Sequence, residues 1–519
     1  MAPLIEAGFL APLPPLLVAA LGAILRRDDQ GLGRLAEYSA LVALGLTVLG
    51  LAGLLLGGPA TFTPGPMLAA LSFRIEPIGV TLQLLVAFIG WIVVRYARTY
   101  LVGVEGGSRF HTPLLATLSA VLVLTASASL PALVLAFVAI GIGLRQLLLF
   151  FPERPAARRA AAKFAMVWGA ADSALVLATV LLMASTEGGH PGGLGTAPQG
   201  GLSALGQAAV ALIVLAAVLK TAAFPLHGWV TEVMEAPTPV SAFLHAGIIN
   251  SGGVLLIKLS PMVSASPGAM AALVMIGGLT ALFGAAVMLT QSAVKTALAW
   301  STVAQMGFML LQCGLGLWPL ALLHIVAHSF YKAHAFLSSG SAVLAVAATR
   351  RPGPVAVPGP WAVGRAFVLA LGLYATVALV FALLLGAKSA RALALGAILV
   401  LGVAYLVAQG LADAAPRALT RRTVLASLGA TLLYFGFHRL ADWLWGGLLP
   451  EVPQAGPLEW ALIVLALLSF AVVAVVQAMF PLWAHHPVAA GLRVHLANGL
   501  YLNAILDRLI GGFGAAGKP

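Results

Sequence analysis

The chain has 519 residues, of which 61% are hydrophobic and only 8% are charged, and its mean hydropathy is +1.03. A soluble globular protein carries roughly 25% charged residues, so this composition excludes an ordinary soluble domain and favours a chain that is surrounded by lipid. The net charge of +12 does not indicate nucleic-acid binding, because the basic residues lie in short loops between apolar runs.

Apolar runs of about 20 residues, the length that crosses a bilayer, recur along the chain and predict an all-α polytopic membrane protein with about fifteen transmembrane helices. We predict helices over residues 9–25, 36–57, 77–97, 111–129, 131–151, 162–185, 204–223, 239–259, 267–288, 293–314, 317–347, 366–386, 392–411, 423–446 and 457–483. The first is expected to be a retained helix, because no charged segment precedes it.

Basic clusters follow the odd-numbered predicted helices, whereas loops after even-numbered helices are nearly free of lysine and arginine. The clusters are Arg26, Arg27 and Arg34; Arg95, Arg98 and Arg109; Arg154, Arg158, Arg159 and Lys163; Arg350 and Arg351; and Arg417, Arg421 and Arg422. The positive-inside rule then predicts an exterior N-terminus and a cytoplasmic C-terminus.

A Pro/Gly-rich stretch at 350–360 separates a part of the chain with many polar residues from a more uniformly apolar C-terminal part. We therefore divide the chain into N-terminal helices at 1–110, a core at 111–347, C-terminal helices at 348–483 and an amphipathic tail at 484–519. The tail is predicted to lie on the cytoplasmic side, either as a surface anchor or as a docking segment for a partner.

Lys220 ends an otherwise apolar run, and Pro225 follows five residues later. Proline removes a helical hydrogen-bond donor, so the helix is expected to break here, and irregular backbone at membrane depth is tolerated only beside protein or water. An ionisable side chain at this depth is a candidate for ion translocation. The alternative is a lysine that snorkels to the membrane surface, which is the role expected of Lys258.

Histidine suits a proton relay because its ordinary pKa lies near neutrality. His245 lies within the predicted helix 239–259, and His227 lies in the loop before it. Lys295 lies in the predicted helix 293–314; Gln291 is four residues before it, and Ser301, Thr302 and Gln305 follow it within the helix. The alternative for these groups is hydrogen bonding between helices.

His324, His328 and Lys332 are each four residues apart, so they are expected to stack on one face of a helix over about 12 Å. Three titratable bases in line could pass protons through bridging water. A zinc site formed by the two histidines is the rival interpretation, but it lacks a further ligand and has a neighbouring cation. No CxxC motif or His/Cys ligand set is present, and Cys313 is the one cysteine, so we expect no cofactor in this chain.

Acidic residues are scarce at the predicted membrane depth. Asp172, in the predicted helix 162–185, is expected to pair with a buried base, because a lone buried carboxylate would tend to be protonated. Glu76 opens the predicted helix 77–97 and is a further candidate for the ion path. Weaker candidates are Lys388, His227, Glu232 and Glu235.

Three long motifs, FPLHGW, APTPVSAFLHA and TQSAVKTALAWSTVAQMGFM, resemble the antiporter-like membrane subunits of respiratory complex I and of multisubunit cation/proton antiporters. The resemblance spans about residues 70–345. It implies a fold with two inverted five-helix repeats that contain broken helices. It also implies that Lys220, His245, Lys295 and the three bases of the predicted helix 317–347 match proton-path positions. One departure is Ile140, which stands where complex I subunits have a glutamate; Arg145 lies nearby.

RYARTYL, FFPERPAA, YKAHAFLSSG and HLANGLYLNAILDRL resemble more closely the DabB family of inorganic carbon transporter subunits. This resemblance implies that the chain carries H⁺ or Na⁺ and couples a cation gradient to CO₂ hydration by a large soluble DabA-like partner, which holds the zinc. The partner is expected on the cytoplasmic side. The tail residues proposed to bind it are His495, Asn498, Tyr501 and Asp507.

Two other functions compete with that of an inorganic carbon transporter subunit. The chain could be a pump subunit of an NADH–quinone oxidoreductase or of a multisubunit antiporter, or it could be a structural scaffold. The buried bases argue against a scaffold. The missing acid at Ile140 and the uniformly apolar C-terminal part favour the inorganic carbon transporter over the pump subunit. In each case the chain is expected to be a transporter subunit and not itself an enzyme.

Overall fold

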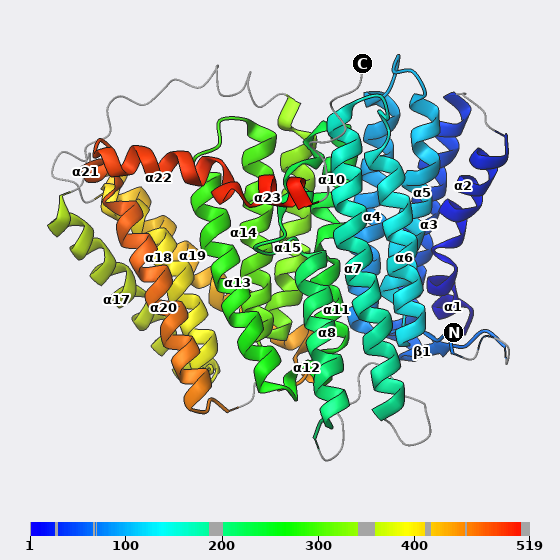
Figure 1. The fold of residues 1–519 in the computed structure, drawn as a ribbon. Coiled ribbons are helices and arrows are strands. Elements are labelled where there is room, and N and C mark those ends of the chain that lie inside the picture. Colours follow the sequence, from blue (N-terminus) through cyan, green and yellow to red (C-terminus); the bar gives the residue numbers. More distant parts are fainter. Residues whose placement is uncertain are drawn as a thin grey trace.

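The computed structural model describes residues 2–25, 30–65, 68, 70–185, 201–340, 359–410, 417–451 and 454–509. Within these residues the chain forms helices that stand side by side, crossed near one end by α22 and α23 (Figure 1). Ten described helical spans are long and apolar enough to cross a membrane, and further apolar helices are shorter. The prediction of an all-α polytopic membrane protein is confirmed.

Each of the fifteen predicted segments overlaps a described helix. The first half of the bundle comprises α1 (Ala2–Leu10), α2 (Leu13–Leu25), α3 (Gln30–Gly57), α4 (Pro77–Tyr100), η2 (Gly107–Phe110), α5 (His111–Ala126), α6 (Leu130–Leu148), α7 (Pro155–Ser185) and α8 (Ala204–Lys220). Strands β1 (Ala60–Phe62) and β2 (Phe73–Ile75) form an antiparallel pair with Ala60 opposite Ile75. The first predicted helix begins earlier than expected, at Ala2, and is interrupted at Pro12.

The second half follows in chain order. Its central elements are α9 (Gly228–Thr231), η3 (Val233–Glu235), α10 (Thr238–Ala246), η4 (Ile248–Asn250), α11 (Ser251–Lys258), α12 (Ser260–Ser264), α13 (Pro267–Met288), α14 (Val294–Gly314) and α15 (Trp318–Leu337). Its last elements are α17 (Pro360–Leu385), α18 (Ala390–Gly410), α19 (Arg417–Trp445), η5 (Gly446–Leu448), α20 (Pro457–Ala478), α21 (Phe480–Trp483), α22 (Pro487–Ala497), η6 (Gly499–Tyr501) and α23 (Leu502–Leu509).

Two breaks interrupt the core of the bundle. The break predicted after Lys220 is confirmed, because α8 ends at that residue and only short helices precede α10. The prediction of one continuous helix over 239–259 is wrong: α10 ends at Ala246, and the turn η4 separates it from α11. Carbonyl groups at the end of α10 accept side-chain hydrogen bonds instead, His245 O from His328 and Ala246 O from Asn250.

Helices α13 and α14 pack backbone to backbone because glycines line their contact. A Cβ added to Gly277 would lie 2.5 Å from Leu311 N, and one added to Gly307 would lie 2.4 Å from Ala281 N. Small residues allow such close approach between membrane helices. This contact fixes α14, which carries Thr302 and Lys295.

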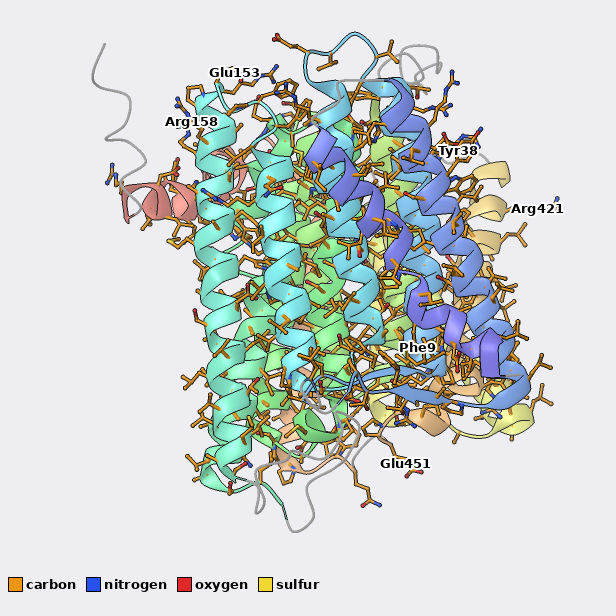
Figure 2. The ribbon with its side chains drawn as sticks, turned by 90° about the vertical axis from the view of Figure 1, so that its right-hand side faces the viewer. Phe9, Tyr38, Glu153, Arg158, Arg421 and Glu451 are labelled. Atoms are coloured by element: carbon orange, nitrogen blue, oxygen red, sulfur yellow. The ribbon has the colours of Figure 1, made fainter. Side chains whose placement is uncertain are left out.

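The two ends of the bundle differ in charge. Arg158 and Arg421 lie at one end, which we call the basic end, whereas Phe9 and Glu451 lie at the other (Figure 2). The latter is also the end of β1 and β2 (Figure 1), and we call it the hairpin end. The alternation of basic loops predicted that Arg158 and Arg421 share one side. The Gly-rich loop at 186–203 lies mostly outside the described residues.

Helices α17 to α20 share an apolar core that includes Phe367, Tyr374, Phe435 and Ile463 and that also contacts α13 to α15. The proposed boundary between residues 347 and 348 lies outside the described residues. After α21 the chain runs sideways, and α22, η6 and α23, which we call the lateral segment (residues 487–509), cross the bundle near the basic end (Figure 1). Helix α22 contacts α13, and α23 contacts α9.

Candidate ion-translocation path

Lys220 is fully buried at the end of α8. Its Nζ donates a hydrogen bond to Asp172 Oδ1 on α7 at 2.6 Å. The same Nζ lies 3.8 Å from the ring centre of Trp168 and 4.3 Å from that of Phe137. A carboxylate and two aromatic faces therefore stabilise this cation inside the bundle. The prediction that Asp172 pairs with a buried base is confirmed, and the expectation of a snorkelling Lys220 is excluded.

The absence of an acid at Ile140 has a structural counterpart. Ile140 is fully buried on α6, one turn after Phe137, whose ring faces Lys220. The carboxylate for Lys220 comes instead from Asp172 on the neighbouring helix α7. Arg145, near the end of α6, is exposed and takes no part in this pair. Lys220 thus has an acidic partner, as in complex I subunits, but this acid lies on α7 and not at the position of Ile140 on α6.

His245 lies beside the break between α10 and α11 and is fully buried. Its Nδ1 lies 3.1 Å from Thr302 Oγ1, and its ring stacks on Phe336 at 4.4 Å between ring centres. Thr302 Oγ1 in turn donates to Leu298 O at 3.1 Å, and Lys332 Nζ donates to the same carbonyl at 2.9 Å. Thr302 therefore links His245 to Lys332 through one shared acceptor.

The three bases of α15 face the interior of the bundle. His328 Nε2 lies 3.2 Å from His245 O, and the rings of His328 and His324 have centres 6.0 Å apart. His324 Nδ1 lies 2.9 Å from Gln312 Oε1. Together with Lys332 and His245, these groups form what we call the buried row: Lys332, Thr302, His245, His328, His324 and Gln312. His324 and His328, the two histidines of the rival zinc interpretation, are thus already in contact with other groups of the protein, Gln312 Oε1 and His245 O.

Lys295 lies apart from the buried row. It is in the first turn of α14 and its side chain is half-buried. The prediction placed it in the helix 293–314, and the structure agrees: Lys295 is the second residue of α14, near the end of the helix. His227 is buried beside α9, with its ring 4.8 Å from Trp300 and 5.4 Å from Phe283 between ring centres. Neither residue forms a hydrogen bond or ion pair with the row in the part of the chain that the structure describes, so their part in translocation stays a prediction.

A further buried lysine, Lys163, was not singled out from the sequence. Its side chain is 2% exposed, and its Nζ lies 2.5 Å from Glu232 Oε1, 2.6 Å from Asp507 Oδ1 and 2.7 Å from Asn503 Oδ1. Asn503 also donates to Glu232. The lateral segment is thereby bound to α7 and to the loop that follows α9. The one local signal is the helical spacing of Lys163 with buried Ala160 and Val167.

The other predicted acids lie near the surface. Glu76 precedes α4 at the hairpin end, with its side chain 30% exposed and 3.6 Å from Arg74. Glu235 pairs with Arg154 at 3.6 Å, and both side chains are about half exposed. Glu232, by contrast, is one of the two carboxylates on Lys163. Glu232 is therefore bound inside the protein and is not a solvated loop charge.

Lys388 belongs to a separate cluster between α17 and α18. Its Nζ lies 2.5 Å from Asp442 Oδ2, and His438 Nε2 lies 3.7 Å from the same oxygen. Tyr434 packs against the ring of His438. Asp442 and His438 lie on α19 and were not candidates from the sequence. The structure brings them to Lys388 and leaves all three away from the buried row.

The proposed partner-binding residues of the tail lie on the lateral segment. Asp507 faces inward to Lys163. His495 packs edge-on against Tyr501, and Asn498 Nδ2 donates to Val494 O. His495, Asn498 and Tyr501 are exposed. A role in binding a partner stays a prediction for these three.

The site and fold define a class of membrane protein. The transmembrane family described as NADH:quinone oxidoreductase/Mrp antiporter matches residues 127–352, which contain Lys220 and the whole buried row. One chain in the structure of the Mrp complex from Dietzia sp. DQ12-45-1b has the same fold, with a TM-score of 0.65 and 22% sequence identity over 98% of this chain and 60% of that chain. The protein is a multi-pass membrane subunit of this antiporter type.

Similar proteins with names identify the family within this class. The chain is 36% identical over 491 residues to "Probable inorganic carbon transporter subunit DabB2" of Halothiobacillus neapolitanus, which covers 91% of this chain and 87% of that protein. It is 44% identical over 267 residues to "Probable inorganic carbon transporter subunit DabB" of Hydrogenovibrio crunogenus, over 50% of this chain and 51% of that protein. The chain belongs to the DabB family of inorganic carbon transporter subunits.

Proposed function

We propose that this chain conducts protons between the two ends of the bundle, and that their flow drives CO₂ hydration to bicarbonate by a soluble partner. The observation that carries the proposal is the buried row, in which titratable bases on α10 and α15 contact one another through Thr302 and the carbonyls of Leu298 and His245. Ionisable groups at membrane depth are costly unless they are paired or hydrated, so their presence there favours a role in translocation. In addition to this row, Lys220 and Asp172 form a buried ion pair in the same bundle.

Protons are favoured over Na⁺ by the chemistry of these side chains. Hard cations such as Na⁺ are bound by oxygen ligands, whereas the row consists mainly of the nitrogen bases His245, His324, His328 and Lys332. Bases of this kind release and accept protons. A sodium path is the alternative that the experiment below distinguishes.

The zinc chemistry is assigned to the partner. The two DabB proteins are named as subunits of an inorganic carbon transporter, which supports an assembly with a further subunit, and we propose that this subunit is a DabA-like, zinc-binding chain. We place that partner on the basic end, where the lateral segment exposes His495, Asn498 and Tyr501. The positive-inside rule makes this end cytoplasmic, so CO₂ would be hydrated inside the cell.

The purified chain alone is expected to hydrate no CO₂ above background, because the catalytic metal belongs to the partner. Cells that contain both chains should accumulate bicarbonate, and a protonophore should abolish this accumulation, whereas replacing Na⁺ by choline should not. Loss on Na⁺ removal would identify Na⁺ as the ion. Hydration by the chain alone, or its purification with quinone-reductase subunits instead of a zinc protein, would contradict the proposal.

The topology gives a separate prediction. A periplasmic reporter enzyme fused before Ala2 should be active, and one fused after Leu509 should be inactive, because α1 begins at the hairpin end and α23 lies near the basic end (Figure 1). A cytoplasmic reporter should give the opposite pair of signals. Matching signals from the two fusion sites would show that the number of membrane crossings is even.

A further inference from the structure

A small cavity lies inside the bundle at the break between α10 and α11. Its volume is about 30 Å³, and a water molecule requires roughly 10–15 Å³ measured in this way. The wall is largely aliphatic, but Thr125, Asn250, Ser251 and Ser329 contribute polar atoms. The cavity therefore has room for about two water molecules.

The break supplies polar atoms for such water. Asn250 Oδ1 and Ser251 Oγ are buried and have no hydrogen-bond partner in the part of the chain that the structure describes. A buried polar atom without a partner costs about 1–3 kcal/mol, and a water molecule that binds two or more such atoms removes this cost. Water is thus favoured at this end of the cavity, although an entirely apolar cavity would stay dry.

One end of the cavity adjoins the buried row. Asn250 Nδ2 donates to Ser329 Oγ at 3.0 Å and to Ala246 O at 3.1 Å. His328, the residue before Ser329, contacts His245 O, the carbonyl before Ala246 O. The same pair of elements, the end of α10 and the middle of α15, thus holds both the row and the polar wall of the cavity.

The other end leads to Lys258. Ser251, Val254 and Lys258 lie on one face of α11, and Val254 lines the cavity. Lys258 lies one turn further, about 6 Å along the helix axis. Its Nζ donates to Ser127 O at 2.9 Å, two residues after Thr125 in the cavity wall. Lys258 is 8% exposed, so the expectation that it snorkels to the membrane surface is wrong.

Between Lys258 and the hairpin end lie Glu76 and the backbone of Ser127. Glu76, at the start of α4, lies close to the cavity wall: a Cβ added to Gly79 would lie 3.1 Å from Thr125 O and 3.7 Å from Glu76 Cγ. The side chain of Glu76 is partly exposed beside Arg74. Ser127 adjoins the hairpin through a bridge with Phe73. A buried base and a partly exposed carboxylate therefore lie in order between the cavity and the surface.

We propose that Lys258 is a further proton-carrying residue, and that water in this cavity connects the buried row at His328 through Lys258 to Glu76 at the hairpin end. This inference rests on the proposed function. It gives the row its own opening to the hairpin end, within the core of the bundle, so that protons need not pass through Lys388 and the C-terminal helices. Lys258 binds and releases the proton at Nζ, and no covalent step is involved.

The first test replaces Lys258 by methionine and by arginine. Methionine removes the proton carrier, and bicarbonate accumulation driven by the gradient should fall by about tenfold, the effect of about 1.4 kcal/mol on a barrier. Arginine keeps the hydrogen bond to Ser127 and the charge opposite Glu76, but it does not release its proton. Lys258→Arg should therefore insert normally and be as defective as Lys258→Met. An active Lys258→Arg would show that Lys258 only holds the structure and would overturn the proposal.

Lys220→Ala is measured in parallel to separate the two hypotheses. Activity in Lys258→Met with loss in Lys220→Ala would overturn the Lys258 branch and leave proton conduction intact. Activity in both variants, at equal membrane levels, would overturn the proposed function itself.

The second test probes water in the cavity without measuring transport. In a Cys313→Ala background, which has no other cysteine, single cysteines replace Ser251, Val254 or Leu255, and Ag⁺ is added from the hairpin side. Ser251 and Val254 line the cavity, whereas buried Leu255 does not. Ser251→Cys is nearly isosteric, so folding is preserved. The thiols of Ser251→Cys and Val254→Cys should react with Ag⁺ at least about tenfold faster than that of Leu255→Cys, which corresponds to a barrier lower by about 1.4 kcal/mol. Equal rates at all three positions would overturn the proposal.

Discussion

Replacing Lys220 by alanine is expected to abolish gradient-driven bicarbonate accumulation while the protein stays in the membrane. Lys220 Nζ is the one nitrogen bound by Asp172 within the described residues, and it is enclosed by the rings of Trp168 and Phe137. Alanine fits the end of α8 at least as well as lysine does, so insertion should persist. The loss should exceed about tenfold, which corresponds to about 1.4 kcal/mol in the barrier. Accumulation of ¹⁴C-labelled bicarbonate, or growth at low CO₂, measures it.

The ion pair itself provides the control. Removing one partner of a buried pair costs about 3–5 kcal/mol, because the other charge is left without compensation. Asp172→Asn combined with Lys220→Met removes both charges and keeps the side-chain volumes. This double variant should reach wild-type membrane levels on a blot and still accumulate no bicarbonate. Wild-type accumulation in the double variant would show that the pair is structural.

Replacing His328 by alanine is expected to be the next most severe change in the row. His328 lies between His324 and Lys332, which are about 12 Å apart along the helix axis, too far for a direct hydrogen bond of about 3 Å. Water can partly fill the gap, so accumulation should fall by less than in Lys220→Ala but remain well below the wild type. The same accumulation assay, corrected for membrane levels, measures the difference.

Two further variants separate proton relay from packing at this position. His328→Gln keeps a donor that can reach His245 O but does not titrate near neutral pH, so it should be as defective as His328→Ala. His334→Ala changes an exposed histidine on the same helix and should leave accumulation unchanged. An active His328→Gln variant would assign His328 a hydrogen-bonding role only.

The bundle and much of its site were predictable from sequence because lipid imposes a simple pattern. Apolar runs of membrane length predict the helices, and a lysine or histidine within such a run stands out, as Lys220, His245 and His328 do. The pairing of Asp172 with some buried base followed from charge alone. That the base is Lys220 depends on how α7 and α8 pack, which periodicity does not determine.

The features of the site that the sequence did not predict depend on contacts between distant parts of the chain. Lys163 looked like a loop cation because its helix was expected to start at 162, whereas α7 starts at Pro155. Its partners Glu232 and Asn503 are 69 and 340 residues away. Lys258 was expected at the surface because lysines at helix ends usually snorkel. Here the end of α11 lies beside Ser127 and the hairpin, which cover it.

The contacts of the lateral segment also order the steps of biogenesis. Helix α23 follows all the candidate membrane spans among the described residues, the last of which ends at Ala478, yet Asp507 and Asn503 bind Lys163 on α7 and meet Glu232 beside α9. A ribosome that has inserted all earlier helices has therefore not yet delivered these ligands, and Lys163 has only Glu232 as a charged partner until α23 emerges. These contacts at the basic end therefore form only after α20 has been synthesised, and a chain that stops before α23 lacks the surface that a partner subunit would meet.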